Sequence, residues 1–426
     1  MMLSIKNQQI YKNGKPFFYY ADTCWSAFTN ISNDDWKYYL NYRKQQGFNT
    51  IQINILKQWD ASGDDLNIYP FPITTNEDGS YSFDYSTLNT NYFDRAEKML
   101  IEMQKRDLVP VLVLMWANYV PGTWASHIAK NNLFPYEAIE KYVTYVTKRF
   151  KKFNPIYFVS GDTDFPSEET TKYYRKVFEV AKQNDSNALY SFHIKGRFEQ
   201  LPDEFKNKID FFSYQSGHNF EGQSTAYKIP IHQRILGFNK PIINTEPCYE
   251  QISYSRNMYG RYSARDVRKA SWSSVLSGAN AGITYGAHGI WSWHHTGATF
   301  GIVEGEGFDA PFDWHDAIHF NGANDIAFLK NIILREFPNG CSPTNILINN
   351  EESIRSAFNK TRNKLIIYVP TNTKINLKDF NFDETNSKVK VIDLLNHNNK
   401  SLNWFKPKTL DMSNVQADSV IILSKE

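Results

Sequence analysis

Alternation of apolar strand-like runs with helical patterns constrains the fold of this chain more than any other feature. Eight short apolar runs have the length of buried strands, at residues 17–22, 48–54, 109–116, 156–161, 189–193, 210–215, 241–245 and 281–285. Helical patterns lie among them, at residues 32–46, 92–106, 136–150, 264–276 and 323–334. Such an order is typical of a parallel sheet wrapped by helices. It predicts a (β/α)₈ TIM barrel over about residues 15–335.

The helix expected at 32–46 shows how local signals support this assignment. Acidic residues in its first turn suit the helix dipole, and Gly47 follows its last residue as a C′ glycine. Asn13-Gly14 indicates a β-hairpin before the first strand. An open doubly wound sheet is the alternative fold. It is disfavoured because no Gly-rich phosphate loop of the expected kind follows an early strand.

Near residue 339 the sequence pattern changes from alternating strands and helices to short strands alone. Short strand-like runs at 364–369, 389–394 and 419–423 are separated by turns rich in Asn, Lys and Thr. This pattern predicts a small antiparallel β-sandwich. We therefore expect a catalytic domain at residues 1–338 and a C-terminal β domain at residues 339–426.

Composition argues against several classes of partner. The formal net charge of the 426 residues is +2, without a basic block, so we expect no nucleic-acid partner and no membrane partner. The start of the chain has no apolar core of signal-peptide type. We accordingly expect a cytoplasmic protein, or an exported one whose signal is absent from this sequence.

Metal and nucleophilic-serine chemistry are also disfavoured. Cys24, Cys248 and Cys341 are too few and too scattered for a zinc cluster or a disulfide framework. The His294-His295 pair lacks the spacing of a known metal motif, and no Gly-x-Ser-x-Gly elbow follows a strand. We expect no metal and no cofactor.

Two carboxylates follow strand-like runs that are far apart in the sequence. Asp162 comes after the fourth run and Glu246 after the seventh. A barrel gathers the carboxyl ends of its strands on one face, so both side chains are expected at one pocket. Paired carboxylates are what glycoside cleavage needs. We assign Glu246 as the nucleophile and Asp162 as the acid/base. Asp164 is an alternative candidate for the acid role.

Other polar and aromatic residues near strand ends are candidates for binding substrate. Aromatic residues make up 15% of the chain, and the faces of Trp and Tyr stack well on sugar rings. The candidates are Asp22, Trp25, Gln52, Asn54, Trp116, His193, Tyr214, Gln215, His218, Tyr285, His288 and Trp291. The long segment 56–91 and the loops after the last two strands are expected to set specificity.

Ordered motifs over most of residues 15–335 resemble the apiosidase-like glycoside hydrolases, glycoside hydrolase family 140. They are Ala21-Asp22-Thr23-Cys24-Trp25, Gln46-Gly47-Phe48-Asn49-Thr50-Ile51-Gln52, Gly161-Asp162, Thr245-Glu246-Pro247-Cys248-Tyr249-Glu250 and Tyr285-Gly286-Ala287-His288-Gly289-Ile290-Trp291. The resemblance implies a barrel, a retaining mechanism with Asp162 as acid/base and Glu246 as nucleophile, and release of terminal β-linked apiofuranose from pectic side chains. It also implies a C-terminal domain of the kind labelled collagen-binding, a label to which we attach no function.

The sequence departs from the expected pattern at Ser160-Gly161-Asp162, where the family usually has Gly-Gly-Asp, and in showing no export signal. We predict an exo-acting retaining glycosidase that releases apiofuranose or a related furanoside from a polysaccharide or glycoconjugate. The alternatives are a carbohydrate-binding protein on an inactive glycosidase scaffold, and a lyase or transglycosylase on the same barrel.

Overall fold

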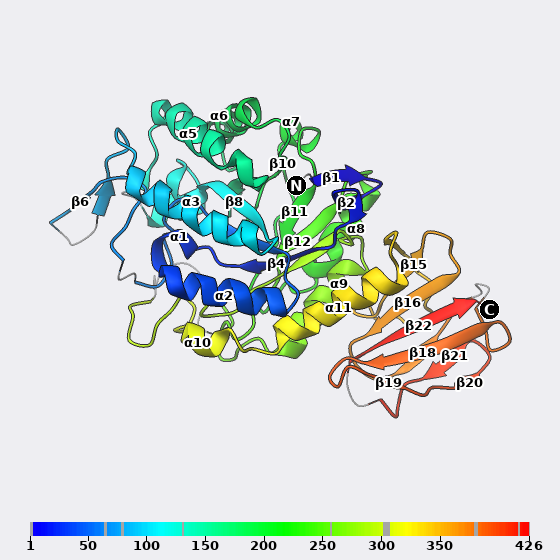
Figure 1. The fold of residues 1–426 in the computed structure, drawn as a ribbon. Coiled ribbons are helices and arrows are strands. Elements are labelled where there is room, and N and C mark those ends of the chain that lie inside the picture. The colour runs from blue at the N-terminus through cyan, green and yellow to red at the C-terminus, as the bar shows by residue number, and fades with distance from the viewer. Residues whose placement is uncertain are drawn as a thin grey trace.

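The computed structural model describes residues 3–63, 66–77, 81–129, 132–255, 258–300, 307–378, 382–415 and 418–425. Eight parallel strands form one sheet in the spatial order β10-β9-β8-β5-β4-β13-β12-β11 (Figure 1). They are β4 (Tyr19–Thr23), β5 (Thr50–Asn54), β8 (Val109–Trp116), β9 (Ile156–Gly161), β10 (Leu189–Ser191), β11 (Phe212–Gln215), β12 (Ile242–Glu246) and β13 (Gly282–Tyr285). The predicted barrel is confirmed, and each predicted strand coincides with one of these to within two residues at either end.

Serine hydroxyls join the two strands at the ends of this sheet. Ser191 Oγ on β10 donates to the carbonyl of Phe211 at 2.7 Å, and Ser213 Oγ on β11 donates to the carbonyl of Phe192 at 2.7 Å. These bonds use backbone carbonyl groups that would accept from the neighbouring strand if the two strands were regularly paired. The sheet therefore closes into a barrel, and the carboxyl ends of all eight strands surround one pocket.

Helices cover the outside of the barrel where the sequence predicted them and at further positions. They are α1 (Ala27–Asn30), α2 (Asn33–Gln45), α3 (Thr90–Lys105), α4 (Trp124–Ile128), α5 (Ile139–Phe150), α6 (Glu168–Asn184), α7 (Asp203–Lys206), α8 (Thr225–Ile235), α9 (Ala264–Val275), α10 (Trp314–Ala317) and α11 (Gly322–Glu336). Ser32 caps α2 by accepting from the backbone N–H of Asp35, and Gly47 adopts the left-handed conformation after its end (φ +87°).

A three-stranded meander precedes the barrel. It consists of β1 (Leu3–Lys6), β2 (Gln9–Lys12) and β3 (Lys15–Pro16). Asn13 and Gly14 form the two-residue turn between β2 and β3, and both have positive φ (51° and 77°), as a type I′ turn requires. The predicted hairpin is present, and the backbone N–H of Phe17 then bonds the carbonyl of Ile10 as the chain enters the barrel.

The structure contains elements that the sequence analysis did not identify. Helices α6, α7 and α8 complete the strand-helix alternation, and α8 contains Pro230. The long segment after β5 carries a small hairpin, β6 (Ile73–Thr75) paired with β7 (Tyr81–Phe83). Residues 64–65 and 78–80 of that segment lie outside the described residues.

The C-terminal region folds into antiparallel sheets, as expected. One sheet has the order β14-β15-β16-β22-β18-β19 and a second the order β17-β21-β20. The strands are β14 (Cys341–Pro343), β15 (Arg355–Asn359), β16 (Lys364–Val369), β17 (Lys374–Asn376), β18 (Ser387–Asp393), β19 (Asn398–Lys400), β20 (Trp404–Lys406), β21 (Thr409–Asp411) and β22 (Ser419–Lys425). The division at residue 338 stays a prediction.

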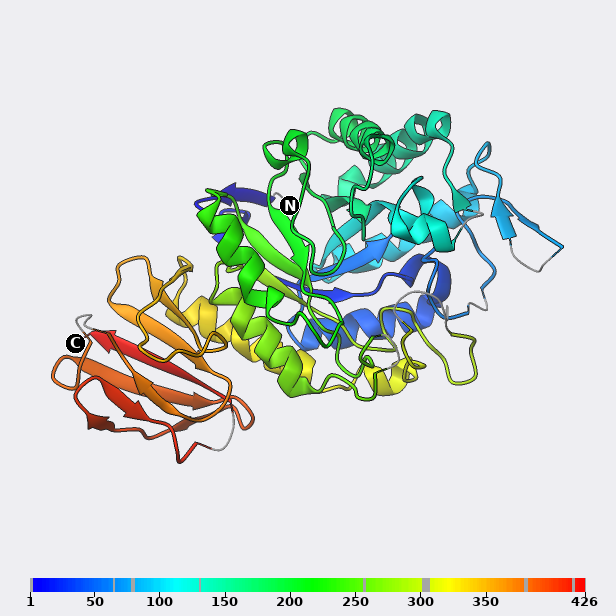
Figure 2. The same cartoon turned by 180° about the vertical axis from the view of Figure 1, so that it is seen from behind.

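A buried ion-pair cluster joins the C-terminal sheets to the barrel beside α9 and α11, where both views place them (Figures 1 and 2). Arg268 on α9 donates to both carboxylate oxygens of Asp418 (3.0 and 2.7 Å) and to Asp325 on α11 (2.7 Å). Trp272 stacks on Tyr368 with ring centroids 6.2 Å apart. In the described part of the chain no helix is long and apolar enough to cross a membrane.

Candidate active site

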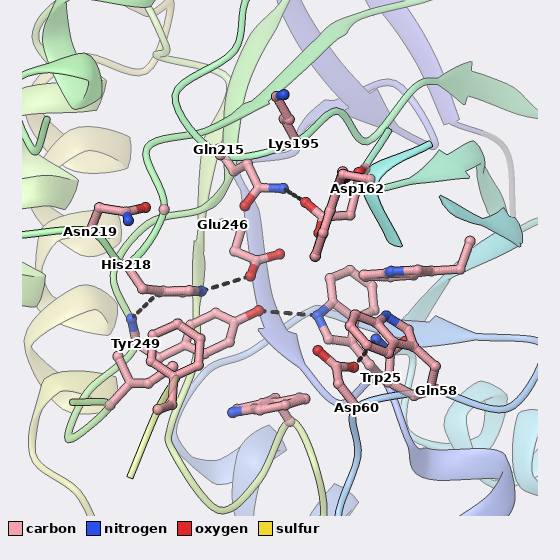
Figure 3. A pocket seen from close by; sticks show the side chains of 18 of the residues that line it. Trp25, Gln58, Asp60, Asp162, Lys195, Gln215, His218, Asn219, Glu246 and Tyr249 are labelled. Carbon is pink, nitrogen blue, oxygen red and sulfur yellow. Dashed lines mark hydrogen bonds and ion pairs between the residues drawn. The ribbon is translucent and has the colours of Figure 1, made fainter. Parts of the chain in front are cut away.

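A pocket of about 340 Å³ lies over the carboxyl ends of the barrel strands (Figure 3). Its lining combines aromatic rings with carboxylates and a few basic and amide groups, and no described residue of the C-terminal sheets takes part. The lining residues are Trp25, Gln58, Trp59, Asp60, Trp116, Trp124, Asp162, Lys195, Gly196, Arg197, Gln215, Gly217, His218, Asn219, Glu246, Tyr249, Ile252, Trp291, Phe300, Gly307 and Phe308. Aromatic walls with convergent polar groups are typical of small-ligand sites.

Glu246, the last residue of β12, is buried at the centre of this pocket and bound by two histidines. His193 Nε2 lies 2.9 Å from Glu246 Oε2, and His218 Nε2 lies 2.8 Å from Glu246 Oε1. Burial alone would raise the pKa of Glu246, but the bonds to His193 and His218 outweigh burial and lower it to about 2. Glu246 is therefore a carboxylate at neutral pH, with both oxygens held in place.

The tautomer of His218 follows from its other nitrogen. The backbone N–H of Tyr249 points to His218 Nδ1 at 3.4 Å, and a backbone N–H is always a donor. His218 Nδ1 is therefore an acceptor, so the proton of the neutral ring sits on Nε2. His218 thus donates this proton in its bond to Glu246 (Figure 3).

Asp162 directly follows β9. Its side chain lines the pocket, and its backbone has a conformation that is rare for a residue other than glycine. Its φ is +59°, the left-handed region, which non-glycine residues adopt mainly where the surroundings hold them. Gly161 precedes it because a Cβ there would lie 2.1 Å from the ring of Trp116. Gln215 Nε2 donates to Asp162 Oδ1 at 2.6 Å and to the carbonyl of Ile194 at 2.7 Å, which anchors the carboxyl group.

The structure separates the two candidates for the acid. Asp164 forms an ion pair with Lys195 at 2.8 Å and is not among the residues that line the pocket, whereas Asp162 is. Geometry therefore favours Asp162 over Asp164 as the partner of Glu246.

Predicted aromatic residues form the walls of the pocket. Trp25 Nε1 donates to the hydroxyl of Tyr249 at 3.1 Å, which fixes both rings near Glu246. Trp291 Nε1 donates to His288 Nδ1 at 3.0 Å, and His288 Nε2 donates to the carbonyl of Asp309 at 2.8 Å. Both ring nitrogens of His288 therefore have protein partners. His288 lies behind Trp291 and does not line the pocket, contrary to expectation.

Three residues that were predicted to line the pocket do not line it, because their side chains point outward from the barrel. Asp22 pairs with Arg43 of α2 at 2.6 Å, and its register partner Tyr285 bonds Glu250 at 2.7 Å. The hydroxyl of Tyr214 donates to the carbonyl of Ala226 at 2.7 Å. Successive strand residues point to opposite faces, so a strand-end position does not itself place a side chain in the pocket.

Three more predicted residues lie beneath the pocket rather than on its surface. Gln52 accepts from the hydroxyl of Tyr19 at 2.7 Å and donates to the carbonyl of Thr245 at 3.1 Å, inside the barrel. Asn54 donates to Gln58 at 3.0 Å. His193 is fully buried under Glu246. These polar side chains are satisfied by the protein and support the pocket from below.

Sequence reasoning missed several lining residues. Asp60, Gln58 and Trp59 come from the segment after β5, Trp124 comes from the start of α4, and Lys195 and Asn219 come from loops. Trp59 was noticeable only as an aromatic residue in a long loop. Among the described residues no group of three or more His, Cys, Asp or Glu side chains is placed to hold a metal ion.

Comparison with known proteins gives a family and a fold. A sequence model described as the apiosidase-like catalytic domain matches residues 6–338. A search of curated proteins gave no match. A solved structure described as a glycoside hydrolase superposes with a TM-score of 0.79 at 21% identity, covering 100% of this chain and 97% of that chain. A glycoside hydrolase family 5 structure from Bacteroides vulgatus ATCC 8482 gives a TM-score of 0.81 at 19% identity, covering 100% and 94%. At these identities the likeness shows the fold alone.

Proposed function

Because the chain belongs to the apiosidase-like family and is therefore a glycoside hydrolase, we propose a specific reaction for its pocket. It removes a terminal apiofuranose or related furanoside from a polysaccharide or glycoconjugate, with retention of anomeric configuration. Glu246 is the nucleophile and Asp162 the acid/base. The proposal rests on one observation. Glu246 is a buried carboxylate that two histidines keep ionised, and it shares its pocket with a second carboxyl group.

The reaction proceeds in two displacements. Glu246 attacks the anomeric carbon while Asp162 gives its proton to the departing glycosidic oxygen, which leaves as an alcohol. Asp162, now a carboxylate, takes a proton from water, and the resulting hydroxide displaces Glu246 from the sugar. After both displacements the protein is unchanged, and one glycoside and one water have become the free sugar and the alcohol.

The distance between the two carboxylates supports this reaction without deciding its stereochemistry. Contacts of 2.6, 3.4 and 2.9 Å lead from Asp162 Oδ1 through Gln215 and His193 to Glu246 Oε2, so the carboxylates lie no farther apart than this path. That limit accommodates both retaining pairs, at about 5–5.5 Å, and inverting pairs, at about 6.5–9.5 Å. Retention rests on the family resemblance and on the fixed, ionised Glu246.

An exo mode of action and a small terminal sugar fit the pocket. Its volume of about 340 Å³ and its aromatic walls suit one ring and the start of the aglycone. The two carboxyl groups in one pocket disfavour the alternative of a carbohydrate-binding protein on an inactive scaffold. We also propose that residues 1–338 form the catalytic domain and residues 339–426 a β-sandwich domain without a part in the reaction.

A panel of 4-nitrophenyl glycosides tests the proposal, with β-D-apiofuranoside and arabinofuranosides included. The wild type should hydrolyse one of them, and Glu246→Ala should abolish this turnover. Asp162→Ala should slow both displacements: departure of poor leaving groups, which lack their proton donor, and hydrolysis of the glycosyl-enzyme, which azide should replace by forming a glycosyl azide. ¹H NMR of the first product reports its anomeric configuration. An active Glu246→Ala variant would contradict the assignment, and an inverted product would contradict retention.

A further inference from the structure

A third carboxylate, Asp60, faces the same pocket as Glu246 and Asp162. It comes from the segment that follows β5, and its side chain is half-buried among the lining residues. In the close view Asp162 is drawn above Glu246 and Asp60 below it (Figure 3). The two proposed catalytic carboxylates leave Asp60 without a role in the displacement chemistry.

A relay of amides ties Asp60 to the barrel. Asn54, the last residue of β5, donates from Nδ2 to Gln58 Oε1 at 3.0 Å. Gln58 Nε2 in turn donates to Asp60 Oδ1 at 2.6 Å. The backbone N–H of Leu56 donates to Asn54 Oδ1 at 3.2 Å and fixes the first amide. A loop carboxylate is thus oriented by a rigid strand, as a binding group requires if it is to act with precise geometry.

The surroundings of Asp60 resemble a binding site more than a structural ion pair. Burial, helped by the charge of Glu246, raises the pKa of Asp60 to about 6, against the bond from Gln58. A carboxylate in such a place costs free energy unless a ligand donates hydrogen bonds to it. Sugar hydroxyl groups are donors of the right kind, and the tryptophan walls supply stacking faces for the same ring.

We propose that Asp60 binds hydroxyl groups of the glycone and so selects the sugar that the pocket accepts. Asn54 and Gln58 are positioning residues that act through it. The acid, Asp162, marks the leaving-group side of the pocket. Asp60 is drawn below Glu246 where Asp162 is drawn above it, so we assign Asp60 to the side that receives the sugar ring (Figure 3). This inference rests on the proposed function and names the residue that gives it glycone specificity.

Leaving-group dependence separates a glycone contact from an acid catalyst. The probes are 4-nitrophenyl and 2,4-dinitrophenyl β-D-apiofuranoside, or the same pair for whichever sugar the wild type hydrolyses. Asp60→Asn should lower kcat/KM roughly ten- to hundredfold, the effect of one hydrogen bond to a charged group, and equally on both probes. Asp162→Ala should instead lower kcat/KM far more on the 4-nitrophenyl probe, whose departure needs a proton.

Two controls exclude trivial causes. Asp84→Asn removes the same charge from the same segment, at a carboxylate outside the pocket that accepts from the backbone N–H of Ser86, and it should leave kcat/KM unchanged. Thermal unfolding of Asp60→Asn should match the wild type, and Asp60→Ser provides a second, smaller side chain.

Each outcome separates this inference from the proposed function. Equal losses on both probes support it. A loss confined to the 4-nitrophenyl probe makes Asp60 the acid and overturns it, as does activity within twofold of the wild type. If Glu246→Gln stays active while Asp60→Asn is impaired, the nucleophile assignment fails and the glycone contact stands. A wild type inactive on every glycoside overturns both.

Discussion

The role proposed for Asp60 leads to a quantitative prediction of how kcat/KM depends on pH. Burial raises the pKa of this carboxyl group from its ordinary value of 3.8 to about 6, so it gains a proton as the pH falls through 6. A protonated Asp60 accepts hydrogen bonds from sugar hydroxyls weakly, much as an asparagine does. The wild type should therefore converge on Asp60→Asn as the solution is acidified.

The magnitude follows from the fraction of Asp60 that is ionised. With a pKa of about 6, nearly all of it is charged at about pH 7.5, roughly one part in eleven at about pH 5, and about one in a hundred at about pH 4. A wild-type advantage of about a hundredfold at neutral pH thus shrinks to about tenfold at about pH 5 and about twofold at about pH 4.

The assay is the ratio of wild-type to Asp60→Asn kcat/KM on the 2,4-dinitrophenyl probe between pH 4 and 8. Titrations common to both proteins cancel in this ratio, and Glu246 stays ionised throughout because its pKa is about 2. His218, which also affects the pKa of Asp60, is present in both proteins. A ratio constant with pH would refute the role of the charge, and a ratio that grows on acidification would mean that Asp60 acts as an acid.

Three further predictions concern the supports of the site and of the fold. Gly161→Ala places a methyl group against the ring of Trp116, so it should cost about 1–3 kcal/mol in urea unfolding and also lower kcat/KM. Arg268→Ala leaves two buried aspartates without their cation and should cost about 3–5 kcal/mol in the same assay, with kcat/KM unchanged at temperatures where the protein stays folded. Gln58→Met frees Asp60 from its donor and should lower kcat/KM by less than Asp60→Asn does, again equally on both aryl probes; a loss restricted to the poorer leaving group would contradict the relay.

The barrel was predictable because its strands are compact apolar runs, each bounded by turn residues. The runs Val109–Trp116 and Ile156–Gly161 were predicted to the residue, and the others differed only at their ends. Helix α8 was harder to find, since Pro230 interrupts the helical pattern and its surface carries few periodic apolar residues. Helix α6 had a Ser167 cap and glutamates in its first turn, so its signals were present but not used.

The candidate site was predicted in its position but not in the direction of each side chain. Glu246 and Asp162 were expected at one pocket because the carboxyl ends of barrel strands meet on one face, and both side chains line it. Asp22 follows the same rule yet points outward to Arg43, since its neighbour Thr23 occupies the inward direction beside Gln52. Sequence position gives the level of a residue in the barrel, whereas the pleat and the strand register decide which face it meets.

Asp60 shows why loop contributions escaped the sequence analysis. Residues 56–91 have no clear periodicity, so nothing in their pattern says which side chain returns to the pocket. Its placement depends on Gln58, and that of Gln58 depends on Asn54, a strand-end residue that was predicted to touch the sugar itself. Asn54 instead contributes one step away, by orienting an amide that orients a carboxylate. An amide at a strand end followed four residues later by a second amide is the only trace of this relay in the sequence, and it acquires meaning once the barrel has fixed where the strand ends.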